Sequence, residues 1–451
     1  MKKSDILIIL MLAAALFLRF YRLDELMPFI GDHAWFYLSA RDMILSGQIP
    51  LVGIESSHTW VHQGSLWTYV LALPLLVSNF NPLSGAYLTA VVGVVTVFLV
   101  YKIGTEMFSR RVGIISAVLF SFSPLVVIHS RIPYHTSLIP LFSLLFFFFL
   151  YKWIKGDVRF FPLVFLILPI LYNLELATMV FWILLIIIFI YGLIKRKTWT
   201  RAVLRTKIIF LSILFFLLPL LPMIVYDLKE NSGFYQSTAF FRLIKIYLFS
   251  KNFTFSFDAV QSVFSSLFLF NQRLVFLAGG FTAFLITISS FFNLLFTARK
   301  KKAFSLYLLS LWVIIPLFGI FVSHTASEAY MPMILPAIIF SIAIFINFFL
   351  RFYKFATIVI VLFILSTNIF LTIKKNYFMN TSPGYGLSFS KRVLIAKNLV
   401  EKSKGNAYNL IGNGPGNEHK NFLLNYEYLT WRLGHPPSKK SEILKFVIEE
   451  K

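Results

Sequence analysis

The stretch "ILIILMLAAALFLRFYRLDELMPFIGDHAWFYLSARD" (residues 6–42) joins two unlike segments. The first is an apolar run near residues 5–22, close to the roughly 20 residues that span a bilayer. The second carries acidic, basic and aromatic side chains and opens a long loop, 23–83. The sequence therefore predicts a first membrane helix that is followed at once by a loop rich in ionisable groups.

The composition places the whole chain among membrane proteins. Hydrophobic residues make up 58% and charged residues 14% of its 451 residues, whereas soluble domains have about 45–50% apolar and about 25% charged residues. The net charge of +23 lies in short blocks between apolar runs, which argues against nucleic-acid binding. Because cysteine is absent, disulfides, thiolate metal sites and cysteine nucleophiles are excluded.

Apolar runs between basic breaks predict an all-α polytopic protein with about eleven membrane helices. The stretch 160–194 carries a polar turn, "YNLE" at 172–175, and has basic flanks on both sides, so we expect it to form a tight hairpin. The predicted spans lie near residues 5–22, 84–104, 111–129, 136–154, 160–174, 177–194, 207–226, 273–296, 304–323, 329–350 and 355–373.

The basic residues set the predicted orientation. Clusters such as 195–207 and 299–302 fall on the same side as the N-terminus, and the positive-inside rule places that side in the cytoplasm. The long loops 23–83 and 227–272 then lie outside, and most acidic residues between the first and last spans fall there. We expect a multi-pass cell-membrane protein with a cytoplasmic N-terminus and an extracytoplasmic C-terminus.

Two domains are expected on this map. Residues 1–373 form the membrane domain, in which the short apolar stretch 65–77 lies along the interface as a juxtamembrane helix. The tail 374–451 is polar and rich in Gly, Asn and Lys. A segment of this length buries only a modest core, so we expect a small, weakly structured outer domain.

Asp32 lies just beyond the first span, after Gly31 and at the start of a segment that is expected to be helical. A carboxylate in this place caps the helix, or serves as the base of a reaction at the membrane surface, and the two roles are compatible. His33, Trp35 and Tyr37 are candidate substrate contacts beside it, although Trp and Tyr also favour membrane interfaces without any further function.

The first loop contains a second polar group, "ESSHTWVHQGSLWTY" (55–69), with Glu55, His58, His62 and Gln63. Two histidines four residues apart share one face of a helix and can bind a metal. Without a third ligand nearby the pattern is equally typical of a polar interfacial loop.

A third group is "HSRIPYHTS" (129–137), at the predicted outer ends of two spans. The guanidinium of Arg131 suits bidentate hydrogen bonding to a phosphate, or it reaches the lipid headgroups as an arginine at a membrane surface commonly does. His129, Tyr134 and His135 add hydrogen-bond donors in the same turn.

Ionisable residues also lie in two outer turns, at Glu175 and in "SHTASEAYMPMILPA" (323–337) with His324, Glu328 and Tyr330. Charged groups this close to a bilayer are functional candidates, or are solvated by the turn. The sequence has no P-loop, no dinucleotide-binding glycine motif after a strand and no GxSxG motif. ATP-driven transport, nucleotide-cofactor redox chemistry and serine hydrolysis therefore lack their usual signatures.

The first span followed by "GDHAWFYLSARDMILSG" (31–47) resembles the GT-C membrane glycosyltransferases, in particular the branch of protein O-mannosyltransferases and lipid A aminoarabinose transferases. The segment "KIGTEMFSRRVG" (102–113), the Ser-Arg turn at Ser130 and the ending "YEYLTWRLGHPP" (426–437) continue the resemblance. Trp35 and His62 stand where the aminoarabinose branch has basic residues that hold phosphate, which argues against that donor sugar.

The resemblance implies a transferase that moves a hexosyl or pentosyl group from a polyprenyl- or dolichyl-phosphate to a hydroxyl of a glycan, lipid or protein, with inversion. Asp32 would be the general base. The donor phosphate would be held by Arg131, His62, His135 and Tyr134. The substrates would be contacted by His33, Trp35, Tyr37, Glu55, His58, Glu175, His324, Glu328 and Tyr330.

Other functions stay open from the sequence. A carrier or flippase for lipid-linked glycans would show paired ionisable residues at mid-membrane depth, where this chain is nearly uncharged. A ligase or polymerase of lipid-linked glycans concentrates arginines in one late outer loop, and 227–272 holds few. No cofactor is certain; a divalent metal, with Glu55, Glu175 or Glu328 as ligands, is possible.

Overall fold

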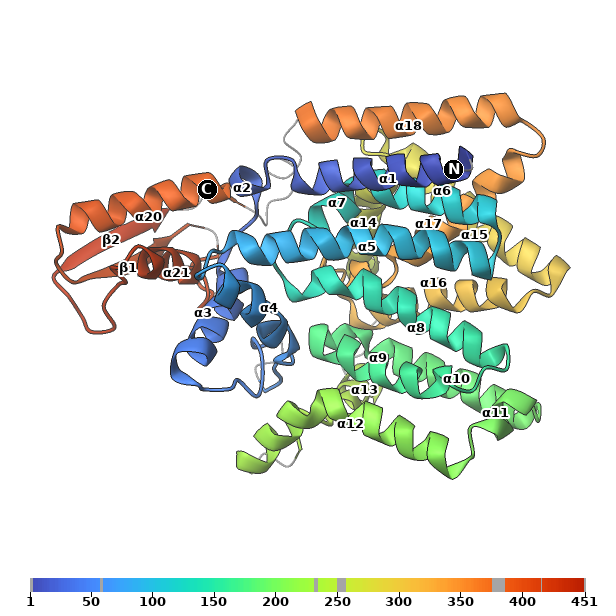
Figure 1. Ribbon diagram of the computed structural model, residues 1–451, viewed down its shortest axis with the longest axis horizontal. Helices are drawn as coiled ribbons and strands as arrows, with labels where there is room; N and C mark the ends of the chain where they lie inside the picture. The colour runs from blue at the N-terminus through green and yellow to red at the C-terminus, as the bar shows by residue number, and fades with distance from the viewer. Residues whose placement is uncertain are drawn as a thin grey trace.

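The structure, a computed structural model, describes residues 3–56, 60–230, 234–249, 257–374, 386–414 and 416–449. Its helices form one bundle that carries a small α/β domain at one end (Figure 1). Over the described residues, seven helices are long and apolar enough to cross a membrane. The predicted all-α membrane architecture is confirmed.

The chain begins with α1 (Lys3–Phe20), and the short α2 (Leu23–Leu26) leads to α3 (Gly31–Ser46) and α4 (Leu66–Val77) of the first long loop. Helix α4 packs against α3. The membrane bundle continues with α5 (Leu83–Met107), α6 (Arg110–Phe122), α7 (Pro124–His129), η1 (His135–Leu138), α8 (Ile139–Ile154), α9 (Phe160–Leu174), η2 (Leu176–Met179), α10 (Val180–Ile194), α11 (Thr198–Ala202) and α12 (Thr206–Lys229).

The second half of the bundle is followed by a domain with a two-stranded parallel sheet, in which Tyr408 lies opposite Leu444. Its elements lie at the end of the bundle opposite α11 (Figure 1). The remaining bounds are α13 (Ala239–Phe249), α14 (Phe257–Val275), α15 (Gly280–Lys301), α16 (Phe304–Ser323), η3 (Met331–Met333), α17 (Leu335–Phe349), α18 (Lys354–Lys374), α20 (Phe389–Ser403), β1 (Tyr408–Asn413), α21 (Leu424–Arg432) and β2 (Leu444–Glu449).

The helices follow the eleven predicted spans, with two differences. The predicted span 111–129 is divided into α6 and α7 at Ser123, which is extended (φ −68°, ψ 120°) because a residue before proline is disfavoured in the α conformation. The predicted span 273–296 starts too early, since α14 ends at Val275 and α15 begins at Gly280. The hairpin is confirmed: α9 ends at Leu174, and Glu175 is extended (φ −157°, ψ 122°).

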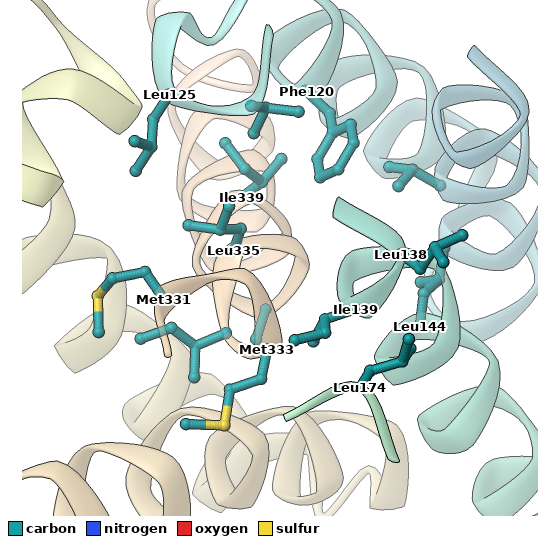
Figure 2. Close-up of a cluster of buried hydrophobic side chains, with 14 of the residues drawn as sticks. Phe120, Leu125, Leu138, Ile139, Leu144, Leu174, Met331, Met333, Leu335 and Ile339 are labelled. Atoms are coloured by element: carbon teal, nitrogen blue, oxygen red, sulfur yellow. The ribbon is translucent and has the colours of Figure 1, made fainter. Parts of the chain in front are cut away.

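Part of the apolar core lies where several helices meet (Figure 2). It joins the starts of α8 and α17 to the end of α9 and to η3, and Trp312 Nε1 donates to the carbonyl of Met333 at 2.8 Å. This packing supports the loops that adjoin it. The labelled side chains are Phe120, Leu125, Leu138, Ile139, Leu144, Leu174, Met331, Met333, Leu335 and Ile339.

The C-terminal tail is more regular than its composition suggests, and the expectation of weak structure is wrong. Its own core, with Leu399, Tyr426 and Ile448, is small, as its length requires. It gains further burial because α21 packs against α3, where Tyr428 and Thr430 are fully buried. The tail is therefore stabilised by docking on the first loop.

Candidate functional site

Asp32 is the second residue of α3, and Ile30, in an extended conformation (φ −88°, ψ 174°), is the N-cap. The aspartate therefore lies in the first helical turn and does not act as the cap. Its negative charge is still favoured there by the helix dipole. The side chain is partly exposed, and its Oδ1 accepts a hydrogen bond from Asn421 Nδ2 at 3.2 Å.

Three aromatic rings, those of His33, Tyr134 and His135, lie in tilted contact with one another next to Asp32. The His33 ring lies 4.9 Å from that of Tyr134, which lies 3.9 Å from that of His135. His33 Nδ1 is 3.1 Å from the carbonyl oxygen of Pro28, and burial lowers the pKa of His33 to about 3. This imidazole is thus neutral at physiological pH and contributes no positive charge.

Glu175 is a second, buried carboxyl group, from the turn of the hairpin. Its oxygens accept hydrogen bonds from Ala177 N at 3.3 Å and from Gln63 Nε2 at 3.3 and 3.4 Å. Burial nevertheless raises the pKa of Glu175 to about 7. A carboxyl group with this pKa exchanges its proton at neutral pH.

Tyr134 links the two carboxyl groups electrostatically. Its pKa is raised well above the ordinary value, mainly by burial and further by the negative charges of Asp32 and Glu175. Segments from five parts of the sequence therefore meet at the head of α3. We call this group the α3 site; its residues are Asp32, His33, Gln63, Tyr134, His135, Glu175 and Asn421.

The segment that contains Glu55 and His62 forms an isolated antiparallel bridge between these two residues. The predicted helical face with two histidines is wrong for His62, and His58 lies outside the described residues. Gly64 follows the bridge, and a side chain there would meet Asn173 Oδ1 at 1.9 Å. Glu55 pairs with Lys420 of the tail, with 3.6 Å between Oε2 and Nζ.

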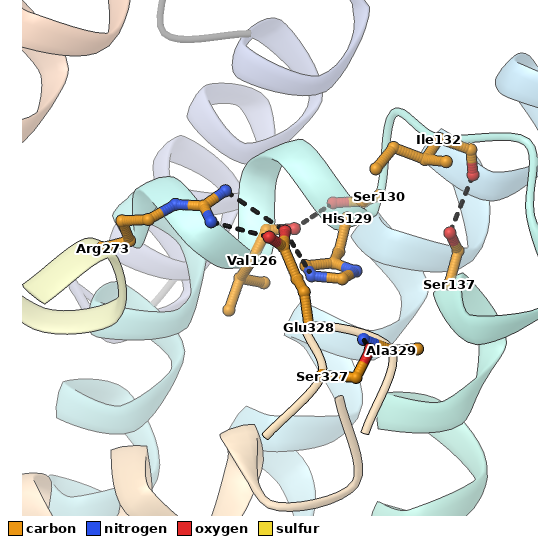
Figure 3. A network of polar contacts seen from close by, with 9 residues as sticks. All are labelled: Val126, His129, Ser130, Ile132, Ser137, Arg273, Ser327, Glu328 and Ala329. Atoms are coloured by element: carbon orange, nitrogen blue, oxygen red, sulfur yellow. Dashed lines mark hydrogen bonds and ion pairs between the residues drawn. The ribbon is translucent and has the colours of Figure 1, made fainter. Parts of the chain in front are cut away.

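Glu328 belongs to a separate polar network (Figure 3). Arg273 donates to its two oxygens at 2.7 and 3.2 Å, and His129 Nε2 lies 3.2 Å from Oε1. Burial alone would raise the pKa of Glu328, but the hydrogen bond with His129 and the charges of His129 and Arg273 hold it below its usual range. His324 and Tyr330 lie in the flanking turns, as the C-cap of α16 and the N-cap of η3.

Arg131 and Tyr37 are engaged in packing. Arg131 is fully buried, and its Nη1 donates to the carbonyls of Leu18 and Arg19, at the end of α1, at 3.0 and 3.1 Å. The Tyr37 hydroxyl donates to the Pro82 carbonyl at 2.7 Å. Trp35 is half-buried, with its ring 5.0 Å from that of Phe36.

Three contributors were given no site role from the sequence. Gln63 belongs to the polar stretch 55–69, and the glycine that follows it, Gly64, is a signal for a closely packed loop. Arg273 lies at the start of the predicted span 273–296 and carries no motif that points to a site. Asn421 is separated from Asp32 by almost the whole chain, so no local pattern points to it.

The described residues do not form a metal centre. No group of three or more His, Asp and Glu side chains lies close enough within them to hold a metal. Glu55 pairs with Lys420 and Glu328 with Arg273, so neither offers an uncompensated carboxylate. Over the part of the chain that the structure describes, these carboxylates do not make up a donor set for a divalent ion.

Comparisons with known proteins agree with this architecture. Residues 62–226 match the family model of dolichyl-phosphate-mannose-protein mannosyltransferases. ArnT from Cupriavidus metallidurans in the apo state is similar with a TM-score of 0.60 and 13% identity, over 98% of this chain and 86% of that chain. The chain has the GT-C fold. The resemblance inferred from the sequence is thereby confirmed.

Two further structures share this fold. The Archaeoglobus fulgidus oligosaccharyltransferase in complex with Zn and sulfate has a TM-score of 0.58 and 12% identity over 96% of this chain, which covers only 62% of that longer protein. ArnT bound to undecaprenyl phosphate has a TM-score of 0.51 and 13% identity, over 96% of this chain and 76% of that chain. No curated protein sequence matches this chain significantly.

Replacing Glu175 by Gln should change how stability depends on pH. The pKa of Glu175 is about 7 in the folded state and lies above the ordinary 4.5, so the folded state binds the proton more tightly than the unfolded state does. The stability that this proton contributes is therefore lost as the pH rises from 4.5 through 7. The loss approaches about 3 kcal/mol when Glu175 is fully ionised. We expect the Tm difference, Glu175→Gln minus wild type, to increase between pH 5.5 and pH 8.5. Parallel curves of Tm against pH for the two proteins would contradict this.

Replacing Arg131 by Ala should destabilise the fold, because two carbonyls at the end of α1 lose a charged donor. The expected loss is about 2–3 kcal/mol, seen as a lower Tm in detergent. Arg159→Ala is the matched control, since Arg159 has a side chain that is 84% exposed and pairs only with Asp157 among the described residues. If Arg131→Ala keeps the wild-type Tm but binds the donor lipid more weakly, Arg131 serves the phosphate instead.

Proposed function

We propose that this protein is a membrane glycosyltransferase that moves a sugar from a polyprenyl- or dolichyl-phosphate to an acceptor hydroxyl, with inversion, at the outer face of the membrane. The proposal rests on one observation above all. Asp32 stands at the head of a helix in a GT-C fold, partly exposed and held by a neutral amide. Within the described residues it makes no ion pair, so its charge stays available to a reacting proton.

The proposed reaction uses Asp32 as the general base. The acceptor oxygen attacks the anomeric carbon from the side opposite the phosphate, and its proton passes to the Asp32 carboxylate. The bond between the anomeric carbon and the phosphate oxygen breaks, and its electron pair leaves with the polyprenyl phosphate. A base within hydrogen-bond reach of the hydroxyl typically accelerates such a step by about 10²–10⁴-fold.

The donor is proposed to be lipid-linked because of two findings. The similar ArnT was solved with undecaprenyl phosphate bound. In this chain an apolar cavity of about 370 Å³ opens between α6, α17 and α18, with Leu119, Ile339 and Ile360 on its walls, and it is suited to a prenyl chain. Arg273 immediately precedes Leu274, which also lines the cavity.

The predicted site residues divide between the two substrates in this proposal. Tyr134 and His135, near Asp32, would contact the sugar and its phosphate. Glu175 and Gln63, which are hydrogen-bonded to each other, would offer hydrogen bonds to hydroxyl groups. The sugar is a hexose or pentose, and the acceptor is a glycan, a lipid or a protein.

The Asp32→Asn variant should lose transfer while keeping the fold, because the amide cannot accept the proton. In detergent, with a panel of polyprenyl-phosphate sugars and acceptors, we expect release of free polyprenyl phosphate to fall by about 10²–10⁴-fold. Mass spectrometry measures the released lipid and identifies the donor sugar.

The control is Asp42→Asn, on the same helix, whose carboxylate is exposed and pairs with Arg41 at 2.7 Å. It should release the lipid at the wild-type rate. If Asp32→Asn is as active as wild type, Asp32 is not the base. If the wild-type protein binds these lipids but never cleaves them, the chain is a carrier for lipid-linked glycans instead.

A further inference from the structure

The C-terminal domain contacts Asp32 through the segment 416–422. Asn421 Nδ2 donates to Asp32 Oδ1 at 3.2 Å. The neighbouring Lys420 lies 3.6 Å from Glu55 in the first loop. The tail thus contacts the first loop both at the proposed base and at Glu55.

Gly31 makes this approach possible. A Cβ atom on Gly31 would lie 1.7 Å from the backbone oxygen of Asn421 and 2.6 Å from its carbonyl carbon. Gly31 has no positive φ, so its backbone conformation suits any residue and the lack of a side chain is what matters. Only glycine fits at position 31, because the backbone of Asn421 lies directly against it.

The segment is held in place by anchors on α21. Asn425 Nδ2 donates to the Phe29 carbonyl at 3.2 Å, just before α3. The Tyr428 hydroxyl donates to the Phe80 carbonyl at 2.9 Å, and the Tyr428 ring lies 5.3 Å from that of Tyr37, one turn further along α3. These contacts fix the tail on α3 from both sides of Asp32.

We propose that Asn421 is a positioning residue for Asp32, an inference that rests on the function proposed above. Its amide holds Oδ1 and so sets the rotation of the carboxylate, which leaves Oδ2 to take the proton of the acceptor hydroxyl. A neutral donor orients the carboxylate without cancelling its charge. A lysine in the same place would cancel that charge. The C-terminal tail then contributes a residue, Asn421, that the proposed reaction needs.

The Asn421→Asp variant tests this role, because it has nearly the same shape but cannot donate the hydrogen bond when ionised. We expect kcat for polyprenyl-phosphate release to fall about 10- to 100-fold, as a small misplacement of a reacting group does. KM for the donor lipid should change little. Asn421→Gln keeps an amide donor on a longer side chain and should recover part of the rate.

The matched control is Asn409→Asp in the same domain, whose amide donates to the carbonyls of Ser438 and Lys440 at 3.0 and 2.8 Å. It should keep the wild-type kcat at temperatures where the protein is folded. Wild-type kcat in Asn421→Asp, or an equal loss in Asn409→Asp, would overturn the positioning role.

A stability cycle separates this inference from the proposed function. If Asn421 bonds Asp32, the Tm losses of Asn421→Ala and Asp32→Ala will not add in the double variant, since both remove one interaction. Additive losses would overturn the inference even in an active enzyme. If the wild type transfers no sugar, the proposed function fails, while the cycle still decides whether this bond forms.

Discussion

The carbonyl groups at the end of α1 impose the constraint on which the α3 site depends. The last carbonyls of a helix have no partner within the helix, and near a bilayer little water is available to replace one. Arg131 supplies the donor for Leu18 and Arg19, which ties α1 to the turn at 129–138. Only α2 separates α1 from α3, and Tyr134 follows Arg131 closely, so this guanidinium joins the two segments that carry Asp32 and Tyr134.

The two carboxyl groups of the site have different chemical environments. Asp32 is partly exposed, at the start of a helix, and accepts a hydrogen bond from an amide. Glu175 is buried, and its pKa is raised to about 7. Pairs of carboxyl groups in unlike surroundings commonly divide their tasks, one staying charged while the other carries a proton. In this site Glu175 is suited to donate a hydrogen bond to a substrate hydroxyl, which a permanently ionised carboxylate cannot do.

The features predicted correctly from the sequence are those with a local signal. Apolar length located the helices, and the polar residues at 172–175 marked the hairpin turn that carries Glu175. The break at Ser123 also had a local cause, Pro124, but it was hidden in a continuous apolar run. The bond between Asn421 and Asp32 depends instead on how the tail docks. No periodicity or spacing encodes that contact, and the glycine at position 31, which lacks a side chain, is its one local sign.

The balance of charge also connects the tail to the site. A departing phosphate needs positive charge where its own charge grows. His33 contributes none, since burial keeps its pKa near 3. Arg392 of α20 is fully buried, and its charge reaches the His33 ring, while Lys420 lies at the edge of the first loop. Both belong to the tail, so the C-terminal domain brings positive charge close to the α3 site.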